Sequence, residues 1–185
     1  MKTDFLPAPL TLGLLALSLS ACGGGTDADS DGDGEVTAEE AQGLVERSGD
    51  QIKPEPGKYR AEMTFINADM PGAPPEMVEM MGESMTNSYE FCLTPEMAEQ
   101  GFGEAMKGSQ SDNCTINQFN IDGNAIDMAM SCDDPNAGQM EMTMNGTISS
   151  TSSDITMVSK GTMGQMGDVE FEMSVQQERI GECDA

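Results

Sequence analysis

The chain of 185 residues lacks histidine and tryptophan, and it has only 8 lysines and arginines against 33 aspartates and glutamates. Histidine is the usual general base, the partner of nucleophilic serine and cysteine, and a common ligand of zinc and copper. Its absence excludes those sites. The adjacent carboxylates Asp133 and Asp134 are the remaining candidates for hydrolytic chemistry, but their position after Cys132 favours a polar turn. We therefore expect that the protein is not an enzyme.

The scarcity of basic side chains leaves a formal net charge of −25. Nucleic-acid binding depends on Lys and Arg contacts to phosphates, and a surface of this sign repels the phosphate backbone. The charge suits cations, basic partners or plain solubility. We predict no nucleic-acid partner and expect a monomer.

Long apolar runs are also missing, apart from residues 10–19 near the N-terminus. This run is shorter than the roughly 20 residues that a membrane-spanning helix needs, which is typical of a signal peptide. It ends in Leu19-Ser20-Ala21-Cys22, which resembles the lipobox of bacterial lipoproteins. The resemblance implies removal of residues 1–21 and lipidation of Cys22, and Gly23 in the next position implies the periplasmic face of the outer membrane. The alternative is an ordinary secretory signal with a free thiol at Cys22.

Residues with oxygen-bearing side chains are concentrated just after this signal sequence, in residues 29–40. An EF-hand loop of twelve residues supplies oxygen ligands from positions 1, 3, 5, 7, 9 and 12, with glycine at position 6. Residues 29–40 resemble such a loop, with Gly34 at position 6 and Val36 at the apolar position 8. The residues in the ligand positions are Asp29, Asp31, Asp33, Glu35 (through its carbonyl), Thr37 and Glu40. We predict that they bind Ca²⁺.

The loop departs from the EF-hand pattern in ways that predict weak binding. No entering helix precedes it, the residue after the last ligand is the small Ala41, and no second loop is available as a partner. We therefore expect affinity in the millimolar class of extracellular modules. The alternative is a solvated acidic spacer that binds no ion.

Four cysteines lie beyond the lipobox, and an even number in an exported chain predicts two disulfides. Residues 122–124, Asp-Gly-Asn, form a strong hairpin signal midway between Cys114 and Cys132. Folding the segment there brings these two cysteines opposite each other, so we predict that they pair. The pair Cys92–Cys183 follows by elimination.

Methionine is abundant, with 18 residues against 6 phenylalanines. Met140, Met142 and Met144 alternate, which places them on one face of a strand. We interpret them as core residues, because only Leu44 and Leu93 represent leucine after the signal peptide. Two alternatives remain open, namely a thioether site for Cu(I) and an adaptable pocket for an apolar small ligand.

Alternation of apolar and polar residues recurs along the rest of the chain and predicts a mainly β fold. We expect an antiparallel meander of about seven strands, with a curved sheet, a sandwich and an open barrel as alternatives. Short helices are expected after the acidic loop, where Thr37 and Glu40 match a capping box, and near residues 76–81 and 94–106. The expected strands are 57–66, 87–93, 114–121, 125–132, 139–148, 153–162 and 168–180. The domain division is a signal peptide over 1–21, a lipid-anchored linker over 22–53 and a β-rich domain over 54–185.

Several short motifs in the β-rich part resemble one bacterial family. They are Pro56-Gly57-Lys58-Tyr59, the segment 70–75, Cys92-Leu-Thr-Pro-Glu96 and Arg179-Ile-Gly-Glu-Cys183. The chain is similar here to the domain of unknown function numbered thirty-six-seventeen, found in small exported proteins and lipoproteins. The resemblance covers about residues 54–183 and implies a periplasmic β-rich domain, without a substrate or an activity.

These observations together predict an envelope lipoprotein with a calcium-binding structural or ligand-binding module. The expected partners are the membrane, through the lipid anchor, and an apolar small ligand or another envelope protein. The alternative function is a copper buffer or chaperone built on methionine.

Overall fold

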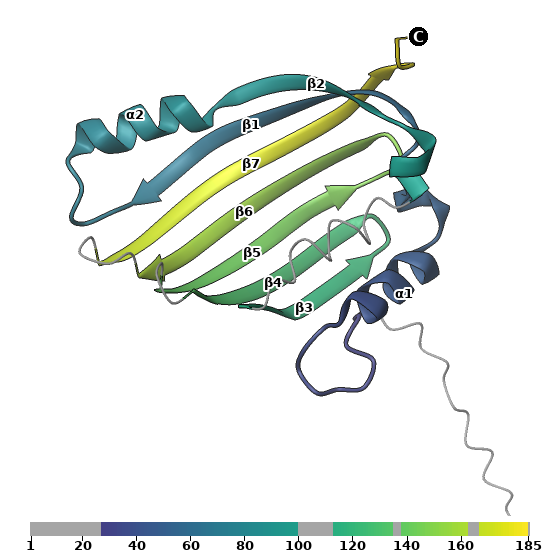
Figure 1. The fold of residues 1–185 in the computed structure, drawn as a ribbon, viewed down its shortest axis with the longest axis horizontal. Coiled ribbons are helices and arrows are strands. Elements are labelled where there is room, and N and C mark those ends of the chain that lie inside the picture. The colour runs from purple at the N-terminus through teal and green to yellow at the C-terminus, as the bar shows by residue number, and fades with distance from the viewer. Residues whose placement is uncertain (1–26, 100–112, 135–137, 163–166, 185) are drawn as a thin grey trace, which may run out of the picture.

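The computed structural model describes residues 27–99, 113–134, 138–162 and 167–184. Its centre is one seven-stranded sheet in the order β2-β1-β7-β6-β5-β4-β3, with all neighbouring strands antiparallel (Figure 1). The strands are β1 (Gly57–Asp69), β2 (Asn87–Leu93), β3 (Cys114–Asp122), β4 (Ala125–Asp134), β5 (Gly138–Ile148), β6 (Ser152–Thr162) and β7 (Asp168–Gly181). The helices are α1 (Ala38–Ser48), the short 3-10 helix η1 (Asp50–Ile52) and α2 (Pro75–Met85).

The predicted class, mainly β with about seven antiparallel strands, is confirmed, and the sheet is open rather than a sandwich or a barrel. The order is a simple meander only from β3 to β7. β1 lies between β2 and β7, so the chain crosses from one edge of the sheet to the other between β2 and β3. β7 is the longest strand, with 14 residues, and it pairs with β1 on one side and β6 on the other.

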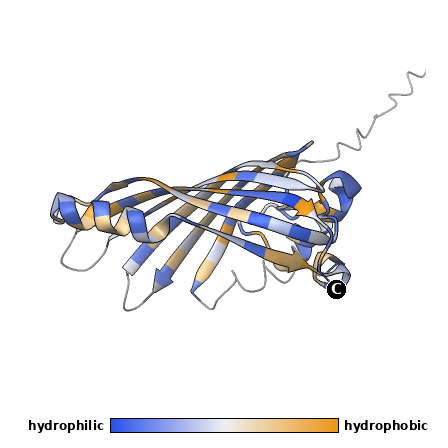
Figure 2. Ribbon diagram, turned by 90° about the horizontal axis from the view of Figure 1, so that it is seen from above, coloured by the Kyte–Doolittle hydropathy of each residue, from blue (hydrophilic) through white to orange (hydrophobic). Residues whose placement is uncertain are grey.

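The two faces of the sheet differ in polarity, because alternate residues point to opposite sides. Figure 2 shows a single curved layer with orange and blue segments along its strands. On one face Met128, Met144, Met157 and Met173 are successive cross-strand partners on β4, β5, β6 and β7, and Phe65 of β1 continues the row. We call these four methionines the methionine row. The opposite face carries charged pairs across neighbouring strands, such as Lys160–Glu170 with Nζ and Oε2 3.1 Å apart.

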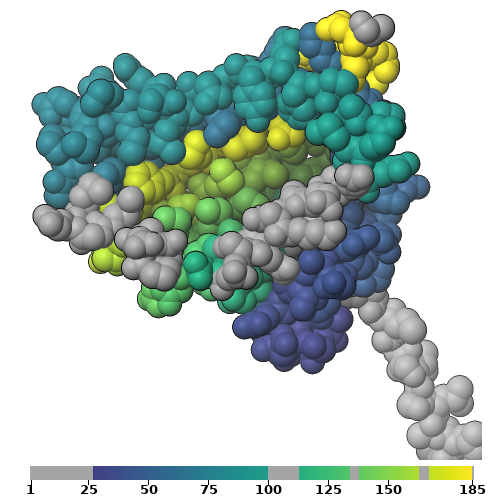
Figure 3. Space-filling model, in the orientation of Figure 1, coloured from purple at the N-terminus to yellow at the C-terminus, as the bar shows by residue number. Residues whose placement is uncertain are grey.

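Two helices cover opposite ends of the apolar face. α2 packs on β1, where a Cβ on Gly82 would lie 2.7 Å from Cδ1 of Phe65, so the helix approaches the ring closely. α1 packs on β3 through the buried side chains of Ala41 and Leu44. Figure 3 shows part of this face of the sheet, in yellow and green, recessed beneath α2 and β2.

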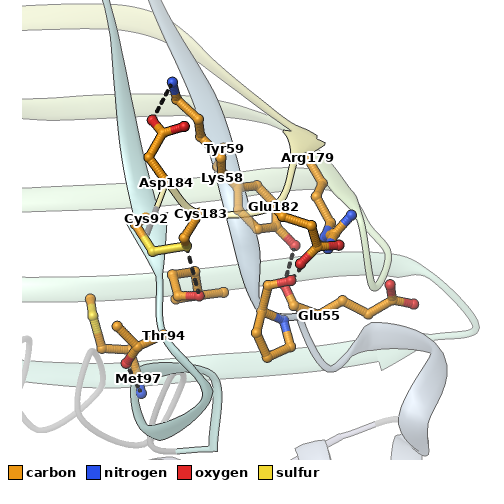
Figure 4. Close-up of a disulfide and its surroundings, with 12 residues drawn as sticks. Glu55, Lys58, Tyr59, Cys92, Thr94, Met97, Arg179, Glu182, Cys183 and Asp184 are labelled. Atoms are coloured by element: carbon orange, nitrogen blue, oxygen red, sulfur yellow. Dashed lines mark hydrogen bonds and ion pairs between the residues drawn. A yellow bond between two sulfur atoms is a disulfide. The ribbon is translucent and has the colours of Figure 1, made fainter.

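One end of the sheet is tied together by a disulfide and a buried tyrosine (Figure 4). Cys92 at the end of β2 is bonded to Cys183, just after β7. The hydroxyl of Tyr59, a residue that is 4% exposed, lies 2.8 Å from the Glu55 carbonyl oxygen and 3.0 Å from that of Ser150. These contacts hold the entry of β1 against the loop between β5 and β6.

Several local predictions can be compared with the structure. The strand predicted at 87–93 has those bounds, whereas the helix predicted at 76–81 extends over Pro75–Met85. A helical turn follows Thr94 as expected, and Thr94 Oγ1 accepts a hydrogen bond from Met97 N at 3.2 Å. Residues 100–106 of that predicted helix lie outside the described residues. Asp133 and Asp134 belong to the end of β4 and do not form the predicted turn. No helix in the described ranges has the length and apolar character needed to cross a membrane.

Candidate metal centre

Three carboxylates converge in the loop before α1. One carboxylate oxygen from each of Asp29, Asp31 and Glu40 lies within 4.8 Å of the others. They occupy positions 1, 3 and 12 of the EF-hand pattern. Hard oxygen donors at this spacing suit Ca²⁺, which takes six to eight such ligands at 2.3–2.6 Å.

Asp29 organises the backbone turn on which this arrangement depends. Its Oδ1 accepts from Gly32 N at 2.7 Å, and its Oδ2 accepts from Gly34 N at 3.0 Å. Both glycines have left-handed backbones, with φ of 76° and 89°. A residue with a Cβ is disfavoured in this region, so glycine at these positions allows the chain to fold back around the carboxylates.

Glu40 closes the loop by joining its first and last parts. Its Oε1 accepts from the backbone N and the hydroxyl of Ser30, at 3.0 and 2.7 Å, and its Oε2 accepts from Thr37 N and Oγ1, both at 3.0 Å. The Thr37 amide is the main cause of a lowered pKa for Glu40, to about 2, and the Ser30 hydroxyl is the next. The side chain is therefore held as an anion, which is the form that a cation requires.

Among the other predicted ligands, the Asp33 carboxylate is outside the convergent group, whereas Glu35 and Thr37 were predicted to bind through a carbonyl and a hydroxyl oxygen. Asp33 Oδ1 accepts from Glu35 N at 2.9 Å in a local turn, and both side chains are exposed. Thr37 is the N-cap of α1, since its hydroxyl accepts from Glu40 N at 3.3 Å to complete the predicted capping box. The structure thus brings together three of the four carboxylates that were predicted as ligands, and it places the Thr37 hydroxyl 3.0 Å from Glu40 Oε2, beside the group.

The loop is attached to the edge strand β3 at two points. Ala28 N donates to Phe119 O at 2.8 Å, and Val36 N donates to Ile116 O at 2.7 Å. Val36 occupies position 8 and is 2% exposed, in the same core cluster as Ile116 and Phe119. Sequence reasoning did not identify β3 as the partner of the loop. The sequence offered one signal, the apolar residue at position 8 of the loop. It indicates that the loop pairs with another segment but does not identify that segment.

The disulfides expected from the cysteine count are present in the structure. Cys114 is bonded to Cys132 across the first register pair of β3 and β4. This bond lies two residues from Ile116, so it braces the part of β3 that receives Val36. All four cysteines of the described residues are in disulfides, so none of them offers a thiolate to a metal.

Comparison with known proteins identifies the β-rich part of the chain. Residues 54–183 match the family described as "Protein of unknown function (DUF3617)". The chain belongs to the DUF3617 family. No curated protein and no solved structure matches it. The DUF3617 match begins after the acidic loop and α1, so the candidate metal centre precedes the matched region and is attached to it through β3.

Proposed function

We propose that this DUF3617 protein is a calcium-binding lipoprotein of the cell envelope, in which the ion secures the N-terminal segment to the edge of the sheet. The observation that carries the proposal is the convergence of Asp29, Asp31 and Glu40 in a glycine-turned loop. Such carboxylates repel one another, and a divalent cation between them relieves that repulsion. The ion's role is structural, since the chain has no histidine to perform acid–base chemistry beside it.

Lipidation of Cys22 and residence on the periplasmic face of the outer membrane are part of the same proposal. They are supported by Leu19-Ser20-Ala21-Cys22 with Gly23, and by disulfides, which persist in oxidising compartments such as the periplasm. Cys22 lies five residues before Asp27, which bridges to Asn120 of β3. At roughly 3.5 Å per extended residue, Asp27 would then lie within about 18 Å of the lipidated cysteine, and the first ligand residue, Asp29, within about 25 Å.

Isothermal titration with CaCl₂ tests the metal site on the processed protein purified in detergent. We expect weak binding, with Kd on the order of 10⁻⁴–10⁻³ M. Binding should be lost in Glu40→Gln and in Asp29→Asn. The matched control is Glu39→Gln, which removes the neighbouring charge from the first turn of α1 and should bind Ca²⁺ like the wild type. Equal heats from Glu40→Gln and Glu39→Gln would contradict the site.

Mass spectrometry of protein extracted from membranes tests the anchor. The intact mass should show cleavage before Cys22 and the addition of acyl chains, and Cys22→Ser should remove both. A processed chain without fatty acid would contradict the lipoprotein part while leaving the calcium part open to its own test.

The methionine row favours a second candidate, a Cu(I) buffer or chaperone. It aligns four thioethers across adjacent strands, and thioether sulfur is a ligand that Cu(I) prefers. Competition against a chromogenic Cu(I) chelator should then show binding that falls in the double variant Met144→Leu, Met157→Leu. The control is Met77→Leu, Met80→Leu on the exposed side of α2. A Cu(I) affinity no greater than that of free methionine would contradict the copper role, and the methionine row would then be explained by core packing.

A further inference from the structure

We propose that residues 75–99 form a docking surface for an extended, basic segment of another protein, which adds as an eighth strand beside β2. These residues comprise α2, β2 and the turn after Leu93, and we call them the docking edge. Figure 1 shows α2 and β2 one after the other along one edge of the sheet, and Figure 3 shows them in teal at the rim of the molecule. The inference does not depend on the proposed calcium site, which lies against β3 at the opposite edge.

The backbone of β2 is open on its outer side. Among the residues that the structure describes, β2 is the last strand of the sheet and pairs with β1 alone. An edge strand presents a row of N–H and C=O groups to which an extended chain can bond. Proteins commonly block such an edge with lysine, proline or a β-bulge, and Asn87–Leu93 has none of these. The opposite edge differs, because Ala28 and Val36 bond to β3, whose register with β4 also shifts between Ile116 and Gln118.

β2 is held firmly to the rest of the sheet, so its outer side is ordered before any partner arrives. The Cys92–Cys183 disulfide ties the end of β2 to the residues that follow β7 (Figure 4). The Glu90 carboxylate lies 3.0 Å from Lys58 Nζ and 3.0 Å from the Arg60 guanidinium, both on β1. Glu90 is the one charged side chain of the strand, so β2 itself has no unbalanced charge. A preordered edge reduces the cost of binding to the ordering of the incoming segment.

Exposed apolar side chains are concentrated on the docking edge. Six large apolar residues of the described chain are exposed, and four of them, at 45–65%, belong to this edge: Met77, Met80, Tyr89 and Met97. The other two lie on β1 and β7. Methionine adapts its shape to different partners, and an aromatic residue on a strand pairs well with an apolar residue on the neighbouring strand. The edge therefore offers apolar contacts in addition to backbone hydrogen bonds.

Charge identifies the kind of partner. The docking edge has six glutamates and no lysine or arginine. Apart from the glutamate within β2, they lie at both ends of the strand, with Glu76, Glu79 and Glu83 in α2 and Glu96 and Glu99 after it. The ion pairs among the described residues do not involve the three glutamates of α2. A basic segment complements this edge, whereas a second copy of this chain, with a net charge of −25, would bring the same acidic edge against it.

The pattern of charges also describes the partner segment. β2 has seven residues, so about seven residues of the partner, or roughly 23 Å of extended chain, pair with it. Apolar residues in the middle of the segment then lie beside Tyr89. Lys or Arg at its two ends lies near the glutamates of α2 and of the turn.

Fluorescence anisotropy with a labelled synthetic peptide tests the inference on the processed full chain, at about 150 mM salt, where exposed charges are screened beyond about 8 Å. The probe is Lys-Arg-Val-Thr-Val-Thr-Val-Arg-Lys. One control peptide has Glu in place of every Lys and Arg, and a second keeps the charges but has Pro in place of each Val. We expect saturable binding of the probe and much weaker binding of both controls. Equal binding of the probe and the proline peptide would overturn strand addition.

Two double variants test the position of the charges. The variant Glu79→Gln, Glu83→Gln should bind the probe about fivefold more weakly, because two exposed ion pairs of ordinary strength together contribute about that factor. The matched control Glu39→Gln, Glu46→Gln removes the same charge from α1 and should bind the probe like the wild type. Tyr89→Ser should also weaken binding. Equal affinities of the two double variants would contradict the docking edge.

Hydrogen exchange read by mass spectrometry locates the bound probe. Saturating probe should slow the exchange of β2 amides at least several-fold and leave β3 amides at the opposite edge unchanged, while β7 amides report whether each variant retains the folded sheet. Binding that leaves β2 unprotected would overturn the inference. Protection of β2 that rises with protein concentration in the absence of the probe, together with a dimer in sedimentation, would assign the edge to a second copy and would also overturn it.

Discussion

Replacing Leu44 by alanine should detach α1 from the sheet without unfolding the sheet. Leu44 is 2% exposed and is one of the largest fully buried side chains, in a cluster with Ile116 and Phe119. Truncation of a buried leucine to alanine costs about 2–5 kcal/mol in lost burial and residual cavity. At roughly 1.4 kcal/mol per factor of ten, the opening equilibrium of the helix rises about 30-fold to several thousand-fold.

Hydrogen exchange read by mass spectrometry measures this change peptide by peptide. In Leu44→Ala, with Ca²⁺ saturating, amides of residues 37–48 should exchange faster by that factor, while those of β1 and β7 should keep their wild-type rates. The matched control is Gln42→Ala on the exposed side of α1. It removes a Gln42–Glu46 hydrogen bond of 3.2 Å, worth only about 0.2–0.5 kcal/mol. The reasoning is refuted if β1 and β7 accelerate together with α1, since helix and sheet would then open as one unit.

Two further changes test the cap of α1 and the packing of the sheet. The lowered pKa of Glu40, about 2, means that its anionic form stabilises the cap above its ordinary pKa near 4.5, and that this contribution is lost as the pH falls from about 4.5 to 2. Without Ca²⁺, the difference in α1 amide exchange between the wild type and Glu40→Gln should therefore shrink across this range, and a constant difference would contradict the assignment. In Gly146→Ala the new Cβ would overlap the Asp154 carbonyl oxygen and lie 2.8 Å from Cα of Ile155, so β5 and β6 must separate. Urea unfolding should show a loss of at least about 1–3 kcal/mol, whereas Thr147→Ala on the exposed side of β5 should cost less.

Local chemistry accounts for the features that sequence reasoning predicted well. The strands follow from period-two alternation, and the β3–β4 hairpin follows from the left-handed backbone of Gly123, with φ of 61°. The start of α1 follows from Thr37 and Glu40, which satisfy each other's backbone amides. Each of these depends on residues a few positions apart, so a single sequence contains the necessary information.

Features that depend on distant residues were not predictable in this way. α2 continues to Met85 through Gly82, an unfavourable helix residue that is used here because Phe65 lies against it. β1 lies between β2 and β7 in the sheet. The alternation of apolar and polar residues identifies the strands but does not indicate which strands pair with each other. The ligand pattern named six residues, but which carboxylates converge depends on local turns, and these leave Asp33 outside the group.

The sequence by itself determined the strands, the start of α1, the antiparallel β class of the domain, and the acidic loop at 29–40. Only the tertiary structure decided that this loop lies on β3, through Val36 and Ile116, which are 80 residues apart in the chain. The physical reason is that spacing along the chain encodes hydrogen bonds within a turn or a helix, whereas an edge strand offers similar backbone groups to any segment that reaches it. Burial of Val36, Ala41 and Leu44 against β3 and β4 selects this pairing, and that burial exists only once the sheet has formed.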